Sequence, residues 1–313
     1  MKKLIVDAHC DTLTAMEYQN RRLGEESGRG HLDLPRMKRA GVNVQFFAAC
    51  VGPEYRHWAT IRALDIIDLF YRELEANTES IEEIRTYADI NRIVDNGKVA
   101  ALLSIEGGDA LSGELSVLRM FYRLGVRAIT LTWNGRNQLA DGVGERRSGG
   151  GLTRRGLEVV KEMNRLGMLV DVSHLADQGF WDVLKNTDKP LIASHSNCRA
   201  LCGHPRNLSD RQIRELAEAG GVIGLNFYPK FICPDKPSLD RLLDHAVHMA
   251  SVGGVGCLGL GSDFDGIEQV TPGLEDVTKI PSLAEGLGKR GFNDGEVAMI
   301  LGGNWLRVLS RVI

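Results

Sequence analysis

The sequence predicts a single-domain α/β protein, a (β/α)₈ TIM barrel that spans residues 1–313. Short runs rich in β-branched residues alternate along the chain with longer amphipathic stretches, and strands that alternate with helices are typical of parallel sheets. Several of these runs are almost entirely apolar, as expected for strands buried on both faces. No linker, low-complexity tract or internal repeat divides the chain.

Eight strands are expected, and each parallel pair requires a crossover connection, usually a helix. The expected strands are Lys3–Ala8, Val42–Ala48, Val99–Ile105, Ala128–Thr132, Leu169–Ser173, Leu191–Ser194, Gly221–Phe227 and Cys257–Ser262. The expected helices are Trp58–Glu75, Glu114–Leu124, Arg154–Leu166, Gln178–Leu184, Asp210–Ala219, Leu239–Val252 and an amphipathic Leu306–Ile313. An open, doubly wound sheet is the alternative fold.

Helix ends are marked by residues that suit them. Thr153 and Ser209 directly precede expected helices and are predicted to be N-caps. Gly125, Gly167 and Gly220 follow expected helices at the position where a glycine commonly ends one. These signals place the helix boundaries to within a few residues.

Composition excludes several classes of partner. The 38 Lys and Arg against 41 Asp and Glu give a net charge of −3, so no basic field attracts nucleic acid. The chain lacks a run of about 18 apolar residues that could span a membrane, and the first apolar run stops at Asp7. Six scattered cysteines fit reduced thiols. We expect a cytoplasmic protein with no nucleic-acid or membrane partner, and a homodimer is left open.

Two polar inserts follow expected strands. The charged segment Glu17–His31 and the Gly- and Arg-rich segment Gly142–Gly151 are expected to be solvated loops. Because loops at the carboxyl ends of barrel strands build active sites, a lid is the alternative for each.

Six side chains able to bind metal follow or end the expected strands. They are His9, Asp11, Glu106, His174, His195 and Asp263. Any one of them alone would be better explained as a buried histidine or a capping acid, but all six lie at carboxyl ends of strands, which meet at one mouth of a barrel. Imidazoles and carboxylates suit Zn²⁺, and six such groups exceed what one ion needs. The sequence therefore predicts two Zn²⁺ per chain, roughly 3.5–4 Å apart.

Other histidines and cysteines are given structural roles. His245 and His248 lie three residues apart on an expected helix and are predicted to belong to its surface or core. Cys198 and Cys202 lie near His195 and His204, which leaves a second small metal site open as a weaker alternative.

Longer motifs around these residues resemble the renal (membrane) dipeptidase family of binuclear zinc peptidases. The motifs are Val6–Thr12, Ser104–Gly107, Asp171–His174, Ala193–Ser196, His204–Asn207 and Gly261–Gly266, with further similarity at Asp33–Arg36, Gln45–Phe47, Asn226–Tyr228 and Gly273–Val277. The similarity runs from residue 5 to about residue 309.

The resemblance implies a role for each site residue. His9 and Asp11 would bind one zinc, His174 and His195 the other, and Glu106 would bridge both. Arg206 would clamp the substrate carboxylate with Tyr228 beside it, and Asp263 would lie near the substrate amine and the scissile bond. The implied reaction is hydrolysis of small dipeptides, including those with a C-terminal D-residue, by a hydroxide that bridges the metals, with Glu106 and Asp263 as catalytic residues.

One position departs from the family pattern. The chain reads Leu131-Thr132-Trp133-Asn134 where better-studied members have a histidine after Leu-Thr, thought to donate to the substrate carbonyl. Trp133 is therefore expected to line the substrate site, and Asn134 is an alternative donor. An amidohydrolase for N-acyl amino acids, lactams or lactones, and a metal-containing binding protein with weakened catalysis, are the alternative functions.

Overall fold

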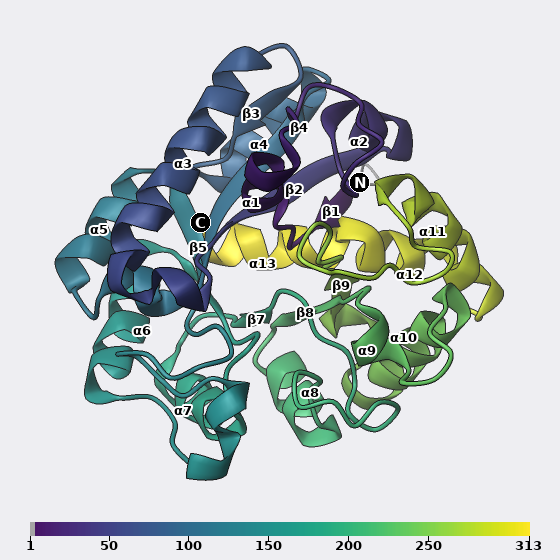
Figure 1. Cartoon of the computed structure of the whole chain (residues 1–313). Helices are drawn as coiled ribbons and strands as arrows, with labels where there is room; N and C mark the ends of the chain where they lie inside the picture. Colours follow the sequence, from purple (N-terminus) through teal and green to yellow (C-terminus); the bar gives the residue numbers. More distant parts are fainter. Residues whose placement is uncertain (1–3) are drawn as a thin grey trace.

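The structure, a computed structural model, describes residues 4–313 and is a closed parallel barrel surrounded by helices (Figure 1). Neighbouring strands follow the order β2-β1-β9-β8-β7-β6-β5-β4, and β4 pairs with β2 to close the ring. All of the pairings are parallel. The closed ring confirms the predicted (β/α)₈ barrel over the open sheet.

Each of the eight predicted runs contains a strand of the ring. The strands are β1 Ile5–Asp7, β2 Val42–Cys50, β4 Val99–Glu106, β5 Val126–Thr130, β6 Leu169–Asp171, β7 Ile192–Ala193, β8 Val222–Leu225 and β9 Leu258–Leu260. The prediction for the first strand included Lys3, which lies outside the described residues.

A further short strand, β3 (Ile81–Glu83), was not predicted. It pairs with the first residues of β4, whereas β5 pairs with β4 from Leu103 onward. Both strands therefore pair with the same edge of β4, β3 with its first residues and β5 with its later ones. Three residues carry too little alternation to signal a strand in the sequence.

Helices form the outer layer of the barrel (Figure 1). The predicted ones are α3 Ala59–Ala76, α5 Leu115–Arg123, α6 Arg154–Leu166, α7 Asp177–Asn186, α8 Asp210–Glu218, α10 Leu239–Gly253 and α13 Asn304–Val312. Those not predicted are α1 Thr12–Gln19, α2 Leu34–Ala40, α4 Tyr87–Asp95, α9 Pro229–Ile232, α11 Ile280–Lys289 and α12 Asp294–Ala298. Thr153 and Ser209 accept hydrogen bonds from Gly156 N–H and Gln212 N–H, which confirms both N-caps.

Helix α13 closes the barrel at the amino-terminal ends of its strands. Trp305 is fully buried against Phe46, with ring centroids 5.9 Å apart, and its Nε1 donates to the carbonyl of Leu260. Arg307 donates to the carbonyls of Gly220, two residues before β8, and Gly256, within the turn that leads into β9. With this end sealed by apolar packing, the opposite end of the barrel is left to hold polar groups.

The first charged insert is exposed at Arg22, Glu25, Glu26 and Arg29, as predicted for a solvated loop, but not at Arg21. Arg21 is buried, pairs with Asp265 at 2.6 Å and donates to the carbonyl of Leu32. The buried ion pair fixes the insert against the barrel mouth, so it forms a wall there. The second insert has exposed residues over Gly144–Ser148, but Val143 is buried and donates to the carbonyl of His174. Among residues 4–313, no helix combines the length and apolar character needed to cross a membrane.

Candidate metal centre and substrate cavity

The six side chains predicted from strand ends come together at the carboxyl ends of the strands. Three overlapping groups of potential metal ligands form, and within each group the ligand atoms lie within 4.8 Å of one another. These groups are His9 with Asp11 and Glu106, Glu106 with His174 and His195, and His9 with His195 and Asp263. All six residues are buried. Below, His9 and Asp11 are called the first half-site, and His174 and His195 the second half-site.

Glu106 lies at the centre of the group. It ends β4, whose residues are all buried, and its carboxylate emerges at the barrel mouth. The Oε1 atom of Glu106 lies 2.8 Å from Nε2 of His174, 3.5 Å from Nε2 of His195 and 3.7 Å from Nε2 of His9. One carboxylate oxygen therefore faces both half-sites, as expected of a bridging ligand.

Hydrogen bonds at Nδ1 fix the orientation of both imidazoles of the second half-site. The Oδ1 atom of Asn134, which can only accept, lies 2.9 Å from Nδ1 of His174. The hydroxyl of Ser194 donates to Asp171, so its oxygen accepts from Nδ1–H of His195 at 2.8 Å. Burial lowers the pKa of both imidazoles, and in the neutral rings both Nε2 atoms then carry lone pairs that face each other at 3.0 Å.

These side chains fit a bound cation. Two lone pairs 3.0 Å apart, beside the carboxylate of Glu106, repel one another unless a positive charge lies between them. In the first half-site, Nε2 of His9 and Oδ1 of Asp11 are buried and have no hydrogen-bond partner. Buried polar atoms without partners are costly. A set of imidazole and carboxylate ligands is also the set that Zn²⁺ prefers.

The half-sites differ in their electrostatics when no cation is bound. Burial lowers the pKa of His9, but Glu106 and Asp11 outweigh burial and raise this pKa to about 10. Burial and the charge of Glu106 raise the pKa of Asp11. Burial lowers the pKa of His195, helped by the charge of His9, and burial and Arg206 lower the pKa of His174. The first half-site therefore holds a proton that the second half-site does not.

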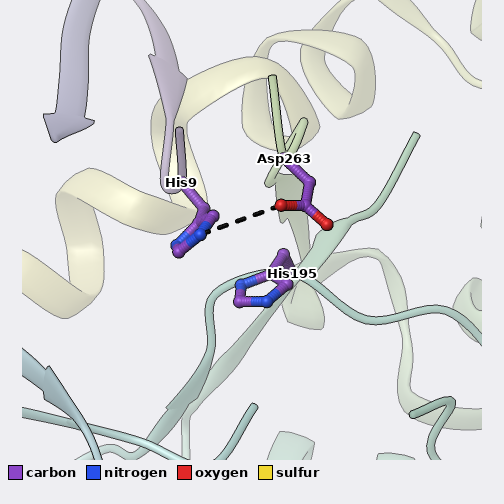
Figure 2. Close-up of side chains that lie close together, drawn as sticks. All are labelled: His9, His195 and Asp263. Carbon is purple, nitrogen blue, oxygen red and sulfur yellow. Dashed lines mark ion pairs between the residues drawn. The ribbon is translucent and has the colours of Figure 1, made fainter. Parts of the chain in front are cut away.

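Asp263 lies beside the candidate metal ligands, and a hydrogen bond on its opposite side holds it in place. Figure 2 shows it with His9 and His195, and its Oδ1 lies 3.9 Å from Nε2 of His9. Its other oxygen, Oδ2, accepts a hydrogen bond from the side-chain amide of Asn226 at 2.9 Å. One oxygen is thus fixed by the protein, and the other faces the centre.

The backbone around Asp263 is shaped for this placement. Asp263 and Asp265 have φ values of 66° and 69°, which non-glycine residues rarely adopt. A Cβ atom on Gly266 would lie 2.0 Å from Oδ2 of Asp11 and 2.7 Å from Oδ1 of Asp263. A glycine is therefore required for the two carboxylates to approach the turn so closely.

A cavity of about 370 Å³ opens onto the centre. Arg206, Tyr228 and Trp133, the residues predicted to bind substrate, all line it together with Asp11, Glu106, His174 and Asp263. Trp133 stacks on the imidazole of His174, with ring centroids 6.0 Å apart. The hydroxyl of Tyr228 donates to Glu268 at the rim.

Arg206 is a buried cation in the cavity wall. Only 5% of the residue is exposed, its NH2 donates to the carbonyl of His195, and its Nε has no partner. Burial lowers its pKa to about 10, so it still carries a charge at neutral pH. Asp210, four residues further along the chain, pairs with His248 rather than with Arg206.

Sequence reasoning missed several residues that hold the site. Asp171, Ser194 and Asn226 orient ligands or Asp263, and Asn134, considered as a substrate donor, bonds to His174. Asp171, Ser194 and Asn226 lie within motifs of the resemblance, which was their only signal in the sequence. Among the described residues, no group of potential metal ligands includes Cys198 or Cys202, and Sγ of Cys198 lies 3.0 Å from Nδ1 of His245, whose Nε2 contacts the carbonyl of Ile232.

Comparison with known proteins shows which family the chain belongs to. The family model of membrane dipeptidases, peptidase family M19, matches residues 1–313. The chain belongs to this family. It is therefore an enzyme of the metallo-dipeptidase type, which confirms the resemblance read from the motifs.

Individual relatives agree with this family over nearly the whole chain. A dipeptidase of Clonostachys rogersoniana, verJ, is 36% identical over 296 residues, covering 90% of this chain and 76% of that protein. A solved structure named dipeptidase AC, also of family M19, is 31% identical with a TM-score of 0.93, and covers 99% of this chain and 98% of that one. A metallopeptidase from Rhodobacter sphaeroides, bound to a phosphinate mimic of L-Ala-D-Ala, is 30% identical with the same TM-score and covers 99% of each chain.

Proposed function

We propose that the protein is a binuclear zinc dipeptidase that hydrolyses small dipeptides, including those with a D-residue at the C-terminal position. The observation that carries this proposal is the position of Glu106, whose Oε1 lies within 4 Å of three imidazole nitrogens from two half-sites. The dipeptide mimic bound by the relative from Rhodobacter sphaeroides supports the substrate class and the D-residue.

The ligands of the two ions would be His9 and Asp11 on one side and His174 and His195 on the other, with Glu106 shared. Bound Zn²⁺ would polarise the scissile carbonyl and lower the pKa of a water from 15.7 towards about 7, which supplies a nucleophile near neutral pH. Asp263 faces the same space with its free oxygen. It would accept the proton of the attacking water and return it to the leaving amine.

Arg206 would fix the length of the substrate. Arg206 lines a cavity otherwise rich in carboxylates and its Nε has no hydrogen-bond partner, so its guanidinium can bind the C-terminal carboxylate of a dipeptide with two parallel hydrogen bonds. Because the distance from Arg206 to the metal ligands is fixed, only one residue would fit beyond the scissile bond. Tyr228 and Trp133 would form the side walls.

The test is hydrolysis of a dipeptide panel by purified protein together with its metal content. We expect close to two equivalents of Zn²⁺, loss of activity with a chelator, and recovery on adding Zn²⁺. C-terminally amidated dipeptides should be poor substrates. Full activity with one equivalent of Zn²⁺ would contradict the bridged pair of ions. Turnover of N-acyl amino acids or lactones without turnover of dipeptides would show that the enzyme acts on a different class of substrate.

A further inference from the structure

Asn134 contacts the metal centre through a single hydrogen bond, and its position is unusually well fixed. Its side-chain oxygen accepts from Nδ1 of His174 at 2.9 Å, 40 residues away in the chain. Its own carbonyl accepts from Gly144 N–H at 2.8 Å. A Cβ atom on Gly142 or Gly144 would lie 2.6 Å from the Asn134 carbonyl oxygen, so both glycines permit the close approach.

The same short segment also holds His174. Val143 N–H, between the two glycines, donates to the carbonyl of His174 at 2.8 Å. His174 has a φ of 67°, a conformation that a residue with a side chain adopts only when its surroundings impose it. Residues 142–144 therefore fix the backbones of both Asn134 and His174, and this sets the distance between their side chains.

The imidazole of His174 is thus constrained on two sides. Trp133 stacks on its face with planes 26° apart, and Asn134 bonds to its edge. An amide oxygen can only accept, so Nδ1 carries a proton, and in the neutral ring Nε2 then presents its lone pair on the side of Glu106, 2.8 Å away. Without Asn134, both tautomers of a neutral imidazole become accessible, and one of them cannot bind a cation at Nε2.

We propose that Asn134 is a positioning residue of the second half-site, which selects the His174 tautomer that binds the cation and thereby sets the affinity for one of two ions. The proposal rests on the metal ions of the proposed function. Removing the hydrogen-bond partner of a metal-binding histidine typically lowers the metal affinity by about 10–100-fold. The effect should be confined to one ion, because Asn134 contacts neither His9 nor Asp11.

The experiment compares Asn134→Leu, which removes the acceptor at similar volume, with Asn134→Asp, which keeps it. Zinc affinity is measured by competition with a chromophoric chelator. Asn134→Leu should weaken one of the two equivalents by about 10–100-fold, and Asn134→Asp should hold both as the wild type does. Asn96→Leu, at an exposed helix end, serves as the control. Wild-type affinity for both ions in Asn134→Leu would overturn the proposal.

A second measurement keeps the proposal testable without any metal. The ¹⁵N shifts of the histidine side chains in chelator-treated protein report which ring nitrogen carries the proton. His174 should be protonated at Nδ1 in the wild type, and Asn134→Leu should shift it to a mixture of tautomers while the other histidine signals stay in place. A His174 signal unchanged by Asn134→Leu would refute the positioning role. Failure of the wild type to bind zinc, with this tautomer shift observed, would instead refute the proposed function and the effect on metal affinity, while the control of the His174 tautomer by Asn134 would stand.

Discussion

The two half-sites face the same carboxylate but are held in different ways. In the second half-site, the Nδ1 atoms of His174 and His195 each have a partner, Asn134 and Ser194, and both Nε2 atoms present lone pairs. In the first half-site, Nε2 of His9 lies 3.4–3.9 Å from three carboxylates and has no hydrogen-bond partner. One half-site is organised by hydrogen bonds and the other by negative charge.

This difference predicts different costs of binding a cation. The lowered pKa values of His174 and His195 keep both ligands neutral, so a cation displaces no proton there. The raised pKa of His9 means that a cation must displace a proton from the first half-site. We therefore expect the second half-site to fill first, and filling of the first to become easier as the pH rises.

The largest effect is expected from Glu106→Gln, which alters the group shared by both half-sites. We expect metal content to fall at both, and kcat/KM for dipeptides to fall by much more than the roughly 10–100-fold that loss of a hydrogen bond to a ligand costs. Metal analysis and dipeptide hydrolysis provide the readout. Glu285→Gln, an exposed pair with Lys289, is the matched control. If one equivalent stays tightly bound in Glu106→Gln, the half-sites are independent and the bridge is wrong.

A smaller effect, confined to substrate, is expected from Arg206→Lys beside the second half-site. Lysine keeps the charge but loses the paired hydrogen bonds, and hydrogen bonds to charged groups contribute about 1.5–3 kcal/mol, or about 10–100-fold in kcat/KM. Zinc content should not change. The measurement compares free with C-terminally amidated dipeptides in both proteins. Equal kcat/KM for the two substrates in the wild type would exclude a carboxylate clamp.

Trp133→His tests whether the wall of the second half-site limits turnover. An indole N–H can donate but is never cationic, and the ring fills space in the cavity. A histidine at this position should raise kcat for simple dipeptides. Loss of one oxyanion donor typically lowers kcat by about 10²–10³-fold, and we expect a smaller gain here because a bound cation would polarise the same carbonyl. Trp58→His, at an exposed tryptophan, is the control. A fall in kcat at unchanged zinc content would show that Trp133 shapes the cavity for another substrate.

The smallest effect is on the stability of the metal-free protein, where the two half-sites should respond to pH with opposite signs. His9 has a raised pKa, so its contribution is complete below about 6.5 and is lost as the pH rises towards 10. His195 has a lowered pKa, so its contribution is present above about 6.5 and is lost as the pH falls.

Urea denaturation of chelator-treated wild type, His9→Asn and His195→Asn checks this expectation. The free energy of unfolding of the wild type relative to His9→Asn should decrease between pH 6 and pH 10. Relative to His195→Asn, it should decrease between pH 7.5 and pH 5. Two differences that change in the same direction would show that the electrostatic contrast between the half-sites is absent.

Sequence alone predicted which side chains gather at the barrel mouth, because these side chains obey a positional rule. Glu106, His174 and His195 each end or directly follow an apolar run, and the carboxyl ends of barrel strands meet at one mouth. The hydrogen bonds that orient these ligands follow no such rule. Asn134 and His174 belong to different loops, and their contact depends on the path of residues 142–144, which no periodicity encodes.

The elements that were missed had weak local signals or depended on distant packing. Helix α11 contains Gly286 and Gly288, which disfavour a helix locally. A Cβ atom on Gly286 would lie 2.6 Å from the side chain of Leu243, so the contact between α11 and α10 requires a glycine at this position. The same glycine lowers the helix propensity of the segment, and the helix was therefore not predicted. The sequence shows that the insert around Arg21 is highly charged, and charged segments are usually solvated. It does not show that Arg21 pairs with the buried Asp265, which lies 244 residues away in the chain.

The position of α13 also constrains how the chain can fold during synthesis. Val6, Phe46 and Leu102 belong to one buried apolar cluster with Trp305. The barrel strands are synthesised before α13, and α13 covers them only once it has been synthesised. Until residues 304–312 leave the ribosome, the interior stays open to water at one end. Contacts between segments about 300 residues apart form slowly. We therefore expect the nascent barrel to expose an apolar surface, of the kind that makes folding intermediates prone to aggregate, until translation passes α13.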